Sequence, residues 1–166
     1  MNPLRPIGVI HSPFTAAPGT PIQGVYAGGA EGEVVVDAEY EAGLSDLAGF
    51  ERIWLVYLFD RAPPARLRVV PFRDTVERGV FATRAPSRPN PVGLSVVRLL
   101  SREGGRLRVA DLDVLDGTPL LDIKPYVPEF DAFPHATAGW LDRPGREGRI
   151  ADDRFRGSAD SSGTRQ

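Results

Sequence analysis

The segment of residues 52–59, RIWLVYLF, constrains the fold of this chain more than any other. It is almost continuously apolar and rich in aromatic and β-branched side chains, which is typical of a strand buried on both faces. Asp60 and Arg61 end this run, and two prolines follow within three residues. We therefore expect a central core strand with a charged pair at its end, beside a loop.

The other apolar segments are short and separated by turns. The chain has 18 glycines and 16 prolines among 166 residues, which favours many short strands over long helices. A doubly wound nucleotide-binding sheet is not expected, because no long helices alternate with strands and no glycine-rich loop follows the first strand. We predict a mainly β fold, a small β-barrel or strongly curved sheet of about seven strands with short helical segments. Besides the central strand, the expected strands are residues 7–10, 32–37, 66–71, 79–83, 94–100, 106–112 and 120–123.

The length suits one domain with a real core, and we expect it at residues 1–142. Residues 143–166 are rich in Arg, Gly, Ser and Asp with almost nothing to bury, so a flexible polar tail is predicted there. The absence of cysteine and the presence of only two histidines argue against a protein-held metal. No apolar run approaches membrane-spanning length and no signal-peptide pattern opens the chain, which predicts a cytoplasmic protein without a membrane partner.

Residues 81–95, FATRAPSRPNPVGLS, form the first candidate for a ligand site. Arg84, Arg88 and Asn90 stand among three prolines, which fix φ and bias the residues before them to extended conformations. The loop is therefore expected to be stiff and to hold these polar groups ready for a ligand. A rigid turn whose guanidinium groups bind its own carbonyls is the alternative interpretation.

A local basic excess overlaps this loop. Residues 66–88 carry six arginines, among them Arg73 and Arg78, against two acidic residues, although the formal net charge of the chain is −2. The overall charge gives no indication of nucleic-acid binding, so any RNA contact is expected to be confined to this region.

Residues 113–124, DVLDGTPLLDIK, form the second candidate. Asp116 at a tight turn is suited to accept hydrogen bonds from ribose hydroxyls, and the Gly117-Thr118 backbone can approach a ligand closely. Lys124 is expected to pair with a neighbouring carboxylate or to reach an anion. The alternative is a structural turn, because Asp-Gly-Thr-Pro is a common turn sequence.

These two segments, with IGVIHSPF at 7–14 and GFERIWLVYLF at 49–59, resemble the TrmO (TsaA-like) family of tRNA N6-methyltransferases. The resemblance spans about residues 5–130 in one order. It implies a β-barrel methyltransferase that works as a homodimer and binds S-adenosylmethionine near the subunit interface. The best-known members methylate N6 of threonylcarbamoyladenosine at position 37 of tRNA.

The resemblance also implies positions for the cofactor site. It assigns cofactor contacts to Arg84 and Leu94, to Pro21 and Gln23 of the first loop, and to the turn formed by Asp116, Gly117, Thr118 and Pro119. Ile22 stands where the family has an arginine. Asp60 and Arg61 are added for their position at the strand end, and Arg88 and Asn90 for their place in the stiff loop. Arg73, Arg78 and Lys124 are the candidates for substrate or RNA contact, and no residue is singled out as a general base.

Three functions are compatible with these features. The first is methyl transfer to a tRNA adenosine, for which holding two reactants in register supplies most of the acceleration. An arginine suits the methionyl carboxylate in such a site, since it binds carboxylates through two parallel hydrogen bonds. The second function keeps the cofactor but has a small molecule or another RNA as methyl acceptor. The third is a non-catalytic module that binds S-adenosylmethionine.

Overall fold

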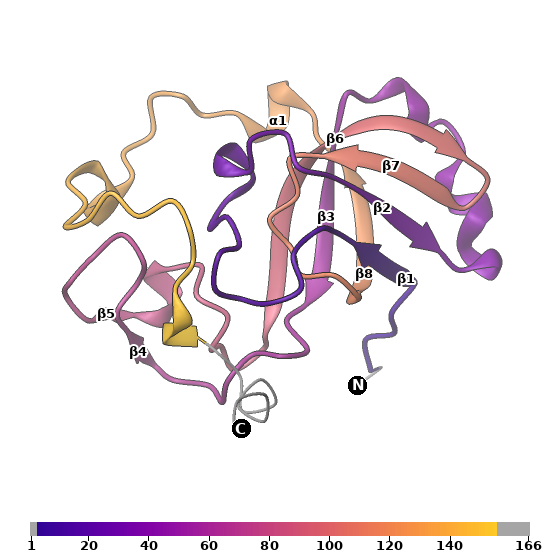
Figure 1. Ribbon diagram of the computed structural model, residues 1–166. Helices are drawn as coiled ribbons and strands as arrows, with labels where there is room; N and C mark the ends of the chain where they lie inside the picture. Colours follow the sequence, from indigo (N-terminus) through magenta and orange to yellow (C-terminus); the bar gives the residue numbers. More distant parts are fainter. Residues whose placement is uncertain (1–2, 156–166) are drawn as a thin grey trace, which may run out of the picture.

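Six antiparallel strands close into a barrel in the computed structural model, which describes residues 3–155 (Figure 1). Their order around the barrel is β1-β2-β7-β6-β3-β8. The strands are β1 Gly8–His11, β2 Glu31–Val36, β3 Arg52–Leu58, β6 Val92–Glu103, β7 Arg106–Ala110 and β8 Thr118–Pro125. The remaining two strands, β4 Arg68–Val69 and β5 Arg78–Gly79, form a separate two-stranded sheet. Short helical segments join them, one α-helical (α1, Pro128–Asp131) and the others 3₁₀. The prediction of a small β-barrel with short helical segments is confirmed.

The central strand β3 pairs with β6 on one side and β8 on the other. Ile53, Leu55 and Tyr57 are buried inside the barrel, whereas the residues between them are only partly buried. The prediction of burial on both faces is therefore wrong, because each strand of a closed barrel has one face toward the core and one toward the outside. The pairing of β3 with β8 shifts register between Val56 and Tyr57, near the end of β3, and Asp60 follows two residues after the strand. Bulges of this kind redirect the side chains that follow them.

The predicted hairpin at residues 104–105 joins β6 to β7, and Gly104 has a φ of +55° that suits the tight turn. The strands predicted at 66–71 and 79–83 are reduced to the two-residue β4 and β5, followed by a 3₁₀ turn at Val80–Ala82. Neither segment is paired with the barrel. Val69 and Val80 of these segments are instead buried in a small second core, together with Ala85.

Residues 143–155, here called the C-terminal strap, return to the body of the molecule (Figure 1). Ala151 exchanges backbone hydrogen bonds with Gly19 (2.9 Å) and Thr20 (2.7 Å). Phe155 is buried in the second core, where its ring packs edge-on against Phe72 with the ring centroids 5.2 Å apart. This arrangement differs from the flexible tail predicted from residue 143, because backbone pairing and one aromatic anchor hold the strap. Residues 156–166 of that predicted tail lie outside the described part of the chain. Among the described residues, no helix is long and apolar enough to cross a membrane.

Candidate functional site

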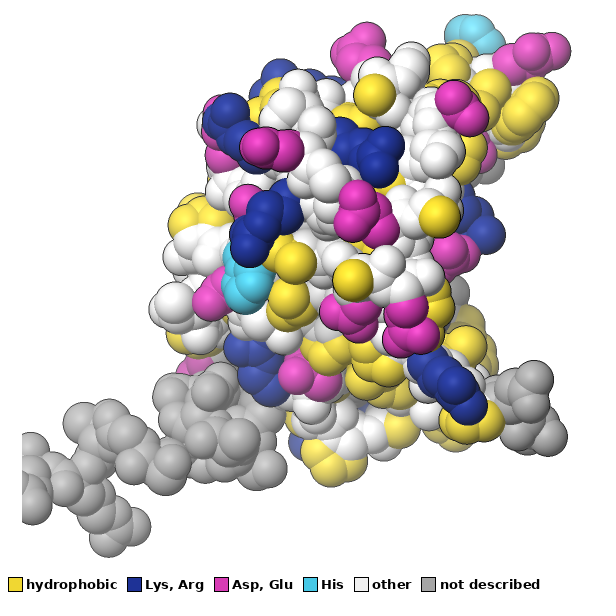
Figure 2. All heavy atoms as spheres, turned by 90° about the vertical axis from the view of Figure 1, so that its right-hand side faces the viewer, with side chains coloured by type: hydrophobic (Ala, Val, Ile, Leu, Met, Phe, Trp, Pro, Cys, Tyr) yellow, Lys and Arg dark blue, Asp and Glu magenta, His cyan; other side chains and the backbone are white. Residues whose placement is uncertain are grey.

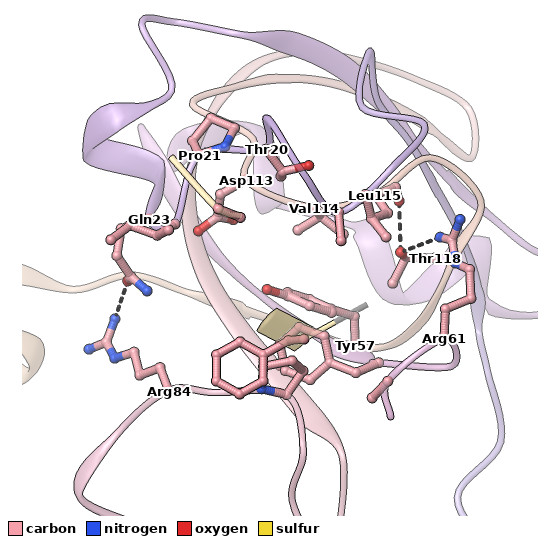
Figure 3. Close-up of a pocket in the computed structure, with 18 of the residues that line it drawn as sticks. Thr20, Pro21, Gln23, Tyr57, Arg61, Arg84, Asp113, Val114, Leu115 and Thr118 are labelled. Atoms are coloured by element: carbon pink, nitrogen blue, oxygen red, sulfur yellow. Dashed lines mark hydrogen bonds between the residues drawn. The ribbon is translucent and has the colours of Figure 1, made fainter. Parts of the chain in front are cut away.

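A cavity of about 310 Å³ lies at the end of the barrel where β3 finishes and β6 begins (Figure 3). Its size falls in the range of small-molecule and cofactor pockets. The lining comes from segments that are distant in sequence, namely residues 17–23, 57–62, 83–94, 113–118 and 151–155, with Phe72. The two loops singled out from the sequence therefore form walls of one cavity, and the first loop and the strap contribute further walls.

The structure brings eight of the twelve predicted cofactor-contact residues to this cavity. They are Pro21, Gln23, Asp60, Arg61, Arg84, Arg88, Leu94 and Thr118. Asn90, Asp116, Gly117 and Pro119 lie outside the lining, although each is within a few residues of a lining residue.

Arg84 and Gln23 connect two walls of the cavity. The Arg84 Nη1 donates a hydrogen bond to Gln23 Oε1 over 2.6 Å, which links the proline-rich loop to the first loop (Figure 3). The Arg84 side chain thereby stands at the cavity with its guanidinium held by a neutral amide, so its positive charge is not neutralised by that contact.

Arg88 has a different role in the same loop. Its Nη1 donates to the backbone carbonyls of Val80 (3.0 Å) and Thr83 (2.8 Å). The structure therefore supports the alternative interpretation for Arg88, namely a guanidinium that binds carbonyls of its own loop. The loop is stiff in part because Arg88 fastens it.

Arg61 connects the end of β3 to the Asp-Gly-Thr-Pro turn. Its Nη2 donates to the backbone carbonyl of Asp116 (2.8 Å) and to Thr118 Oγ1 (3.3 Å). Its Nε is buried, lies 3.5 Å from Asp60 Oδ1, and makes no hydrogen bond to any residue in the range 3–155. Arg61 therefore carries one buried donor that no described residue satisfies.

The carboxylate of Asp116 is held by residues outside the cavity. Its Oδ1 accepts hydrogen bonds from the backbone amide of Ser12 and from His11 Nδ1, each over 3.1 Å. The hydrogen bond from the Ser12 amide, together with His11, lowers the pKa of Asp116 below its usual range. The prediction that this carboxylate presents itself to a ribose is thus at odds with the geometry, in which the turn contributes Thr118 to the cavity lining.

Sequence reasoning missed a buried polar group at the base of the cavity. The Tyr57 hydroxyl lies 2.9 Å from Ser95 Oγ, and Ser95 Oγ donates to Asp113 Oδ1 over 2.5 Å. Burial raises the pKa of Asp113 above its ordinary value, and burial likewise raises the pKa of Tyr57. The signal in the sequence is a lone carboxylate in the apolar run Leu112 to Leu115, which sequence reasoning grouped with the turn without giving it a role.

The three residues predicted to contact RNA lie away from the cavity lining. Arg78 pairs with Asp74 (Nε to Oδ2, 2.7 Å) and lies over the Trp140 ring, with its guanidinium carbon 5.5 Å from the ring centroid. Arg73 Nη1 donates to the Tyr26 hydroxyl over 3.3 Å. Lys124 pairs with Asp122 over 2.8 Å, in agreement with the expectation that it pairs with a neighbouring carboxylate.

Charges of both signs are mixed on the face shown in Figure 2, which is the right-hand side of Figure 1. Across β2 and β7, Arg108 pairs with Glu31 over 2.8 Å and Arg106 pairs with Glu33. No broad basic area is visible in that view. Within residues 3–155, no group of three or more histidine and acidic side chains is placed to hold a metal ion.

Comparison with known proteins gives consistent results. The model of the tRNA-methyltransferase O N-terminal domain matches residues 9–132. A probable S-adenosyl-L-methionine-binding protein of Pyrococcus abyssi is 54% identical over 139 residues, which cover 84% of this chain and 76% of the relative. The tRNA (adenine(37)-N6)-methyltransferase of Escherichia coli is 35% identical over 144 residues, covering 81% of this chain and 61% of that enzyme.

Among solved structures, the crystal structure of TrmO from Pseudomonas aeruginosa superposes with a TM-score of 0.74 at 41% identity. The match covers 87% of this chain and 64% of that one, so this chain spans less than two thirds of the length of the solved protein. The strap lies beyond the range that the family model matches.

Proposed function

This chain belongs to the tRNA-methyltransferase O family, and from that premise we propose that it binds S-adenosylmethionine in the barrel-end cavity and transfers its methyl group to a tRNA adenine. The most specific form of the proposal names the acceptor as N6 of threonylcarbamoyladenosine at position 37. The Escherichia coli relative, a tRNA (adenine(37)-N6)-methyltransferase, supports a tRNA adenine at this position.

The observation that carries the proposal is the mixture of groups in the cavity wall. Asp60 supplies a carboxylate, and Arg61 and Arg84 supply guanidinium groups, in a cavity whose other walls include Tyr57 and Phe155. S-adenosylmethionine carries a carboxylate, a cationic sulfonium, ribose hydroxyls and an adenine ring. Guanidinium groups suit the carboxylate, and aromatic walls suit the adenine ring. Acidic and other hydrogen-bonding groups suit the sulfonium and the ribose hydroxyls. The residues present therefore fit the cofactor.

In the proposed complex the cofactor supplies an electrophilic methyl group on positively charged sulfur. Arg84, already held by Gln23, is placed to bind the methionyl carboxylate. Thr118 and the turn behind it are fixed by Arg61, so they present a preformed polar wall. Because these groups are ordered before the ligand arrives, binding costs less conformational entropy.

There is a second candidate for the methyl acceptor. Several curated relatives bear only the name S-adenosyl-L-methionine-binding protein, including one from Archaeoglobus fulgidus that is 48% identical over 128 residues. Arg78 pairs with Asp74 and Lys124 pairs with Asp122, so two of the charges expected to contact RNA are already in ion pairs. These facts favour, as the alternative, the same cofactor site serving a small molecule or another RNA, or binding without transfer.

We further propose a cytoplasmic homodimer with the cavity near the subunit interface. Large apolar side chains are exposed beside the cavity segments, with Phe81 exposed by 75% and Val25 by 86%. Where such exposed apolar side chains adjoin one another, they mark surfaces for protein contact. Sedimentation equilibrium should give twice the mass of one chain, and a single-chain mass at micromolar concentration would contradict the dimer.

The binding part of the proposal is tested by calorimetric titration with S-adenosylmethionine, using the wild-type protein and Arg84→Ala. We expect saturable binding by the wild type and a loss of about tenfold or more in affinity for the variant, because a charge-assisted hydrogen bond is lost. Phe133→Ala, which removes an exposed side chain outside the cavity lining, is the control and should bind normally. Absence of wild-type binding at millimolar ligand would refute the proposal.

A further inference from the structure

Tyr57, Ser95 and Asp113 form a chain of hydrogen bonds that runs from inside the barrel to the cavity. Ser95 gives its hydroxyl proton to Asp113, so the hydroxyl of Tyr57 must donate to Ser95 Oγ. Both donors are therefore oriented toward one carboxylate. Hydrogen bonds arranged in this sense strengthen one another and stabilise negative charge at the end of the chain.

The proline-rich loop leads directly into the residues that build this arrangement. A Cβ at Gly93 would lie 2.1 Å from Cε2 of Tyr57, so only glycine leaves room for the tyrosine ring. Ser95 lies two residues further on the same strand, and side chains two apart on a strand share a face. Within the Gly-Leu-Ser sequence, Gly93 leaves room for the Tyr57 ring and Ser95 donates a hydrogen bond to Asp113. Leu94, which lies between Gly93 and Ser95, lines the cavity.

Asp113 differs from the other two carboxylates that line the cavity. Asp60 lies 3.5 Å from Arg61, and its side chain is 37% exposed. Asp152 pairs with Arg154 over 2.6 Å, and this hydrogen bond lowers its pKa. Asp113 is partly buried, forms no ion pair with an arginine among the described residues, and accepts a hydrogen bond from the Ser95 hydroxyl. A carboxylate in this setting is a better proton acceptor than one neutralised by an arginine.

We propose that Asp113 is the catalytic base of the methyl transfer, accepting the proton that the acceptor nitrogen loses. This inference rests on the proposed function. As the bond forms between the exocyclic nitrogen and the methyl carbon, the carbon–sulfur bond breaks and its electron pair stays on sulfur. The N–H bond leaves its electron pair on nitrogen, and its proton passes to an Asp113 carboxylate oxygen and then to solvent. Ser95 and Tyr57 are positioning residues for Asp113.

The first test is the variant Asp113→Asn, which keeps the shape of the side chain and removes its basicity. We expect its kcat with tRNA to fall by about 100-fold or more, with the affinity for S-adenosylmethionine within about threefold of the wild type. Asp37→Asn is the matched control, because Asp37 is exposed, lies outside the cavity lining and makes no side-chain capping hydrogen bond. It should keep kcat within about twofold, as expected for a surface substitution.

The second test is the pH profile of kcat for Ser95→Ala and Tyr57→Phe. The Ser95 hydrogen bond lowers the pKa of Asp113, and nearby Arg84 and the Gly24 amide act in the same direction. Loss of the Ser95 donor should therefore move the acidic limb of the profile to higher pH, and Tyr57→Phe should do so less. A role limited to folding would change stability without moving this limb.

The outcomes separate the two proposals. If the kcat of Asp113→Asn is within tenfold of the wild-type kcat, the proposed role of Asp113 is overturned and the proposed function stands. A loss of cofactor affinity of more than tenfold in Asp113→Asn would also overturn it, because Asp113 would then be a cofactor ligand. Absence of turnover by the wild-type protein would overturn the proposed function, and this inference with it.

Discussion

At the scale of single residues, Arg84 and Arg88 show which side-chain roles can be predicted from the sequence and which cannot. Both arginines lie in the same proline-rich loop, and their sequence surroundings are nearly equivalent. Only the fold shows that Arg88 binds carbonyls of its own loop while Arg84 reaches Gln23 across the cavity. The direction of a side chain in an irregular loop depends on contacts with distant segments, which no local pattern encodes.

Gly93 gives a prediction about packing. Gly93→Ala places a methyl group within contact distance of the buried Tyr57 ring, so the ring must move. We expect a loss of about 1–3 kcal/mol in the free energy of unfolding, measured by urea denaturation. Gly79→Ala is the control, since nothing lies within 4 Å of its Cβ position and its φ is −61°. Equal stability of the two variants would contradict the account of Gly93.

Asp113 gives a prediction about pH and stability. Its folded pKa is raised above the unfolded value by burial, so folding favours its protonated form. The stability that this group contributes is present below the unfolded pKa and is lost as the pH rises through the folded pKa. Asp113→Asn does not titrate, so its melting temperature relative to the wild type should rise between about pH 4 and pH 8. A difference that is constant or that falls over this range would contradict the direction of the shift.

At the scale of the elements, the strands that pair in the barrel were predictable and the smaller pieces were not. Residues 52–58 and the hairpin at residues 104–105 have strong local signals, namely a long apolar run and a paired glycine turn. The segments predicted at 66–71 and 79–83 have apolar residues as well, but these serve a second core instead of the barrel. Whether a short apolar segment joins the main sheet depends on long-range pairing.

The strap provides a prediction at this scale, because it forms part of the cavity wall while lying beyond the matched family range. Phe155→Ala removes its aromatic anchor in the second core, which is separate from the barrel core. We expect about a tenfold loss in affinity for S-adenosylmethionine by calorimetry, with the barrel still folded, because weakly held segments open locally. Unchanged affinity would show that the strap is not needed for the site.

At the scale of the whole molecule, the distribution of charge limits RNA binding. The chain has a formal net charge of −2, and Arg78, Arg106 and Arg108 are paired with acidic side chains. These pairings reduce the number of cationic groups that are free to neutralise phosphates. The binding of tRNA should therefore depend on salt only moderately for a nucleic-acid-binding protein.

This dependence can be measured through the KM for tRNA. With about two phosphate contacts, the KM should rise about tenfold between 50 and 200 mM salt, while the KM for S-adenosylmethionine changes little. A rise of about 1,000-fold or more would indicate many more phosphate contacts than the charge distribution suggests.

The central claim is that the barrel-end cavity is a methyltransferase site for tRNA adenine. The most direct measurement is mass spectrometry of nucleosides from tRNA incubated with the protein and S-adenosylmethionine bearing a trideuterated methyl group. The tRNA should carry unmethylated threonylcarbamoyladenosine at position 37. We predict that this nucleoside gains one trideuteromethyl group, with fragmentation placing it on the N6-modified base, and that Asp113→Asn gives almost none. Binding of the cofactor without any labelled nucleoside would contradict the claim.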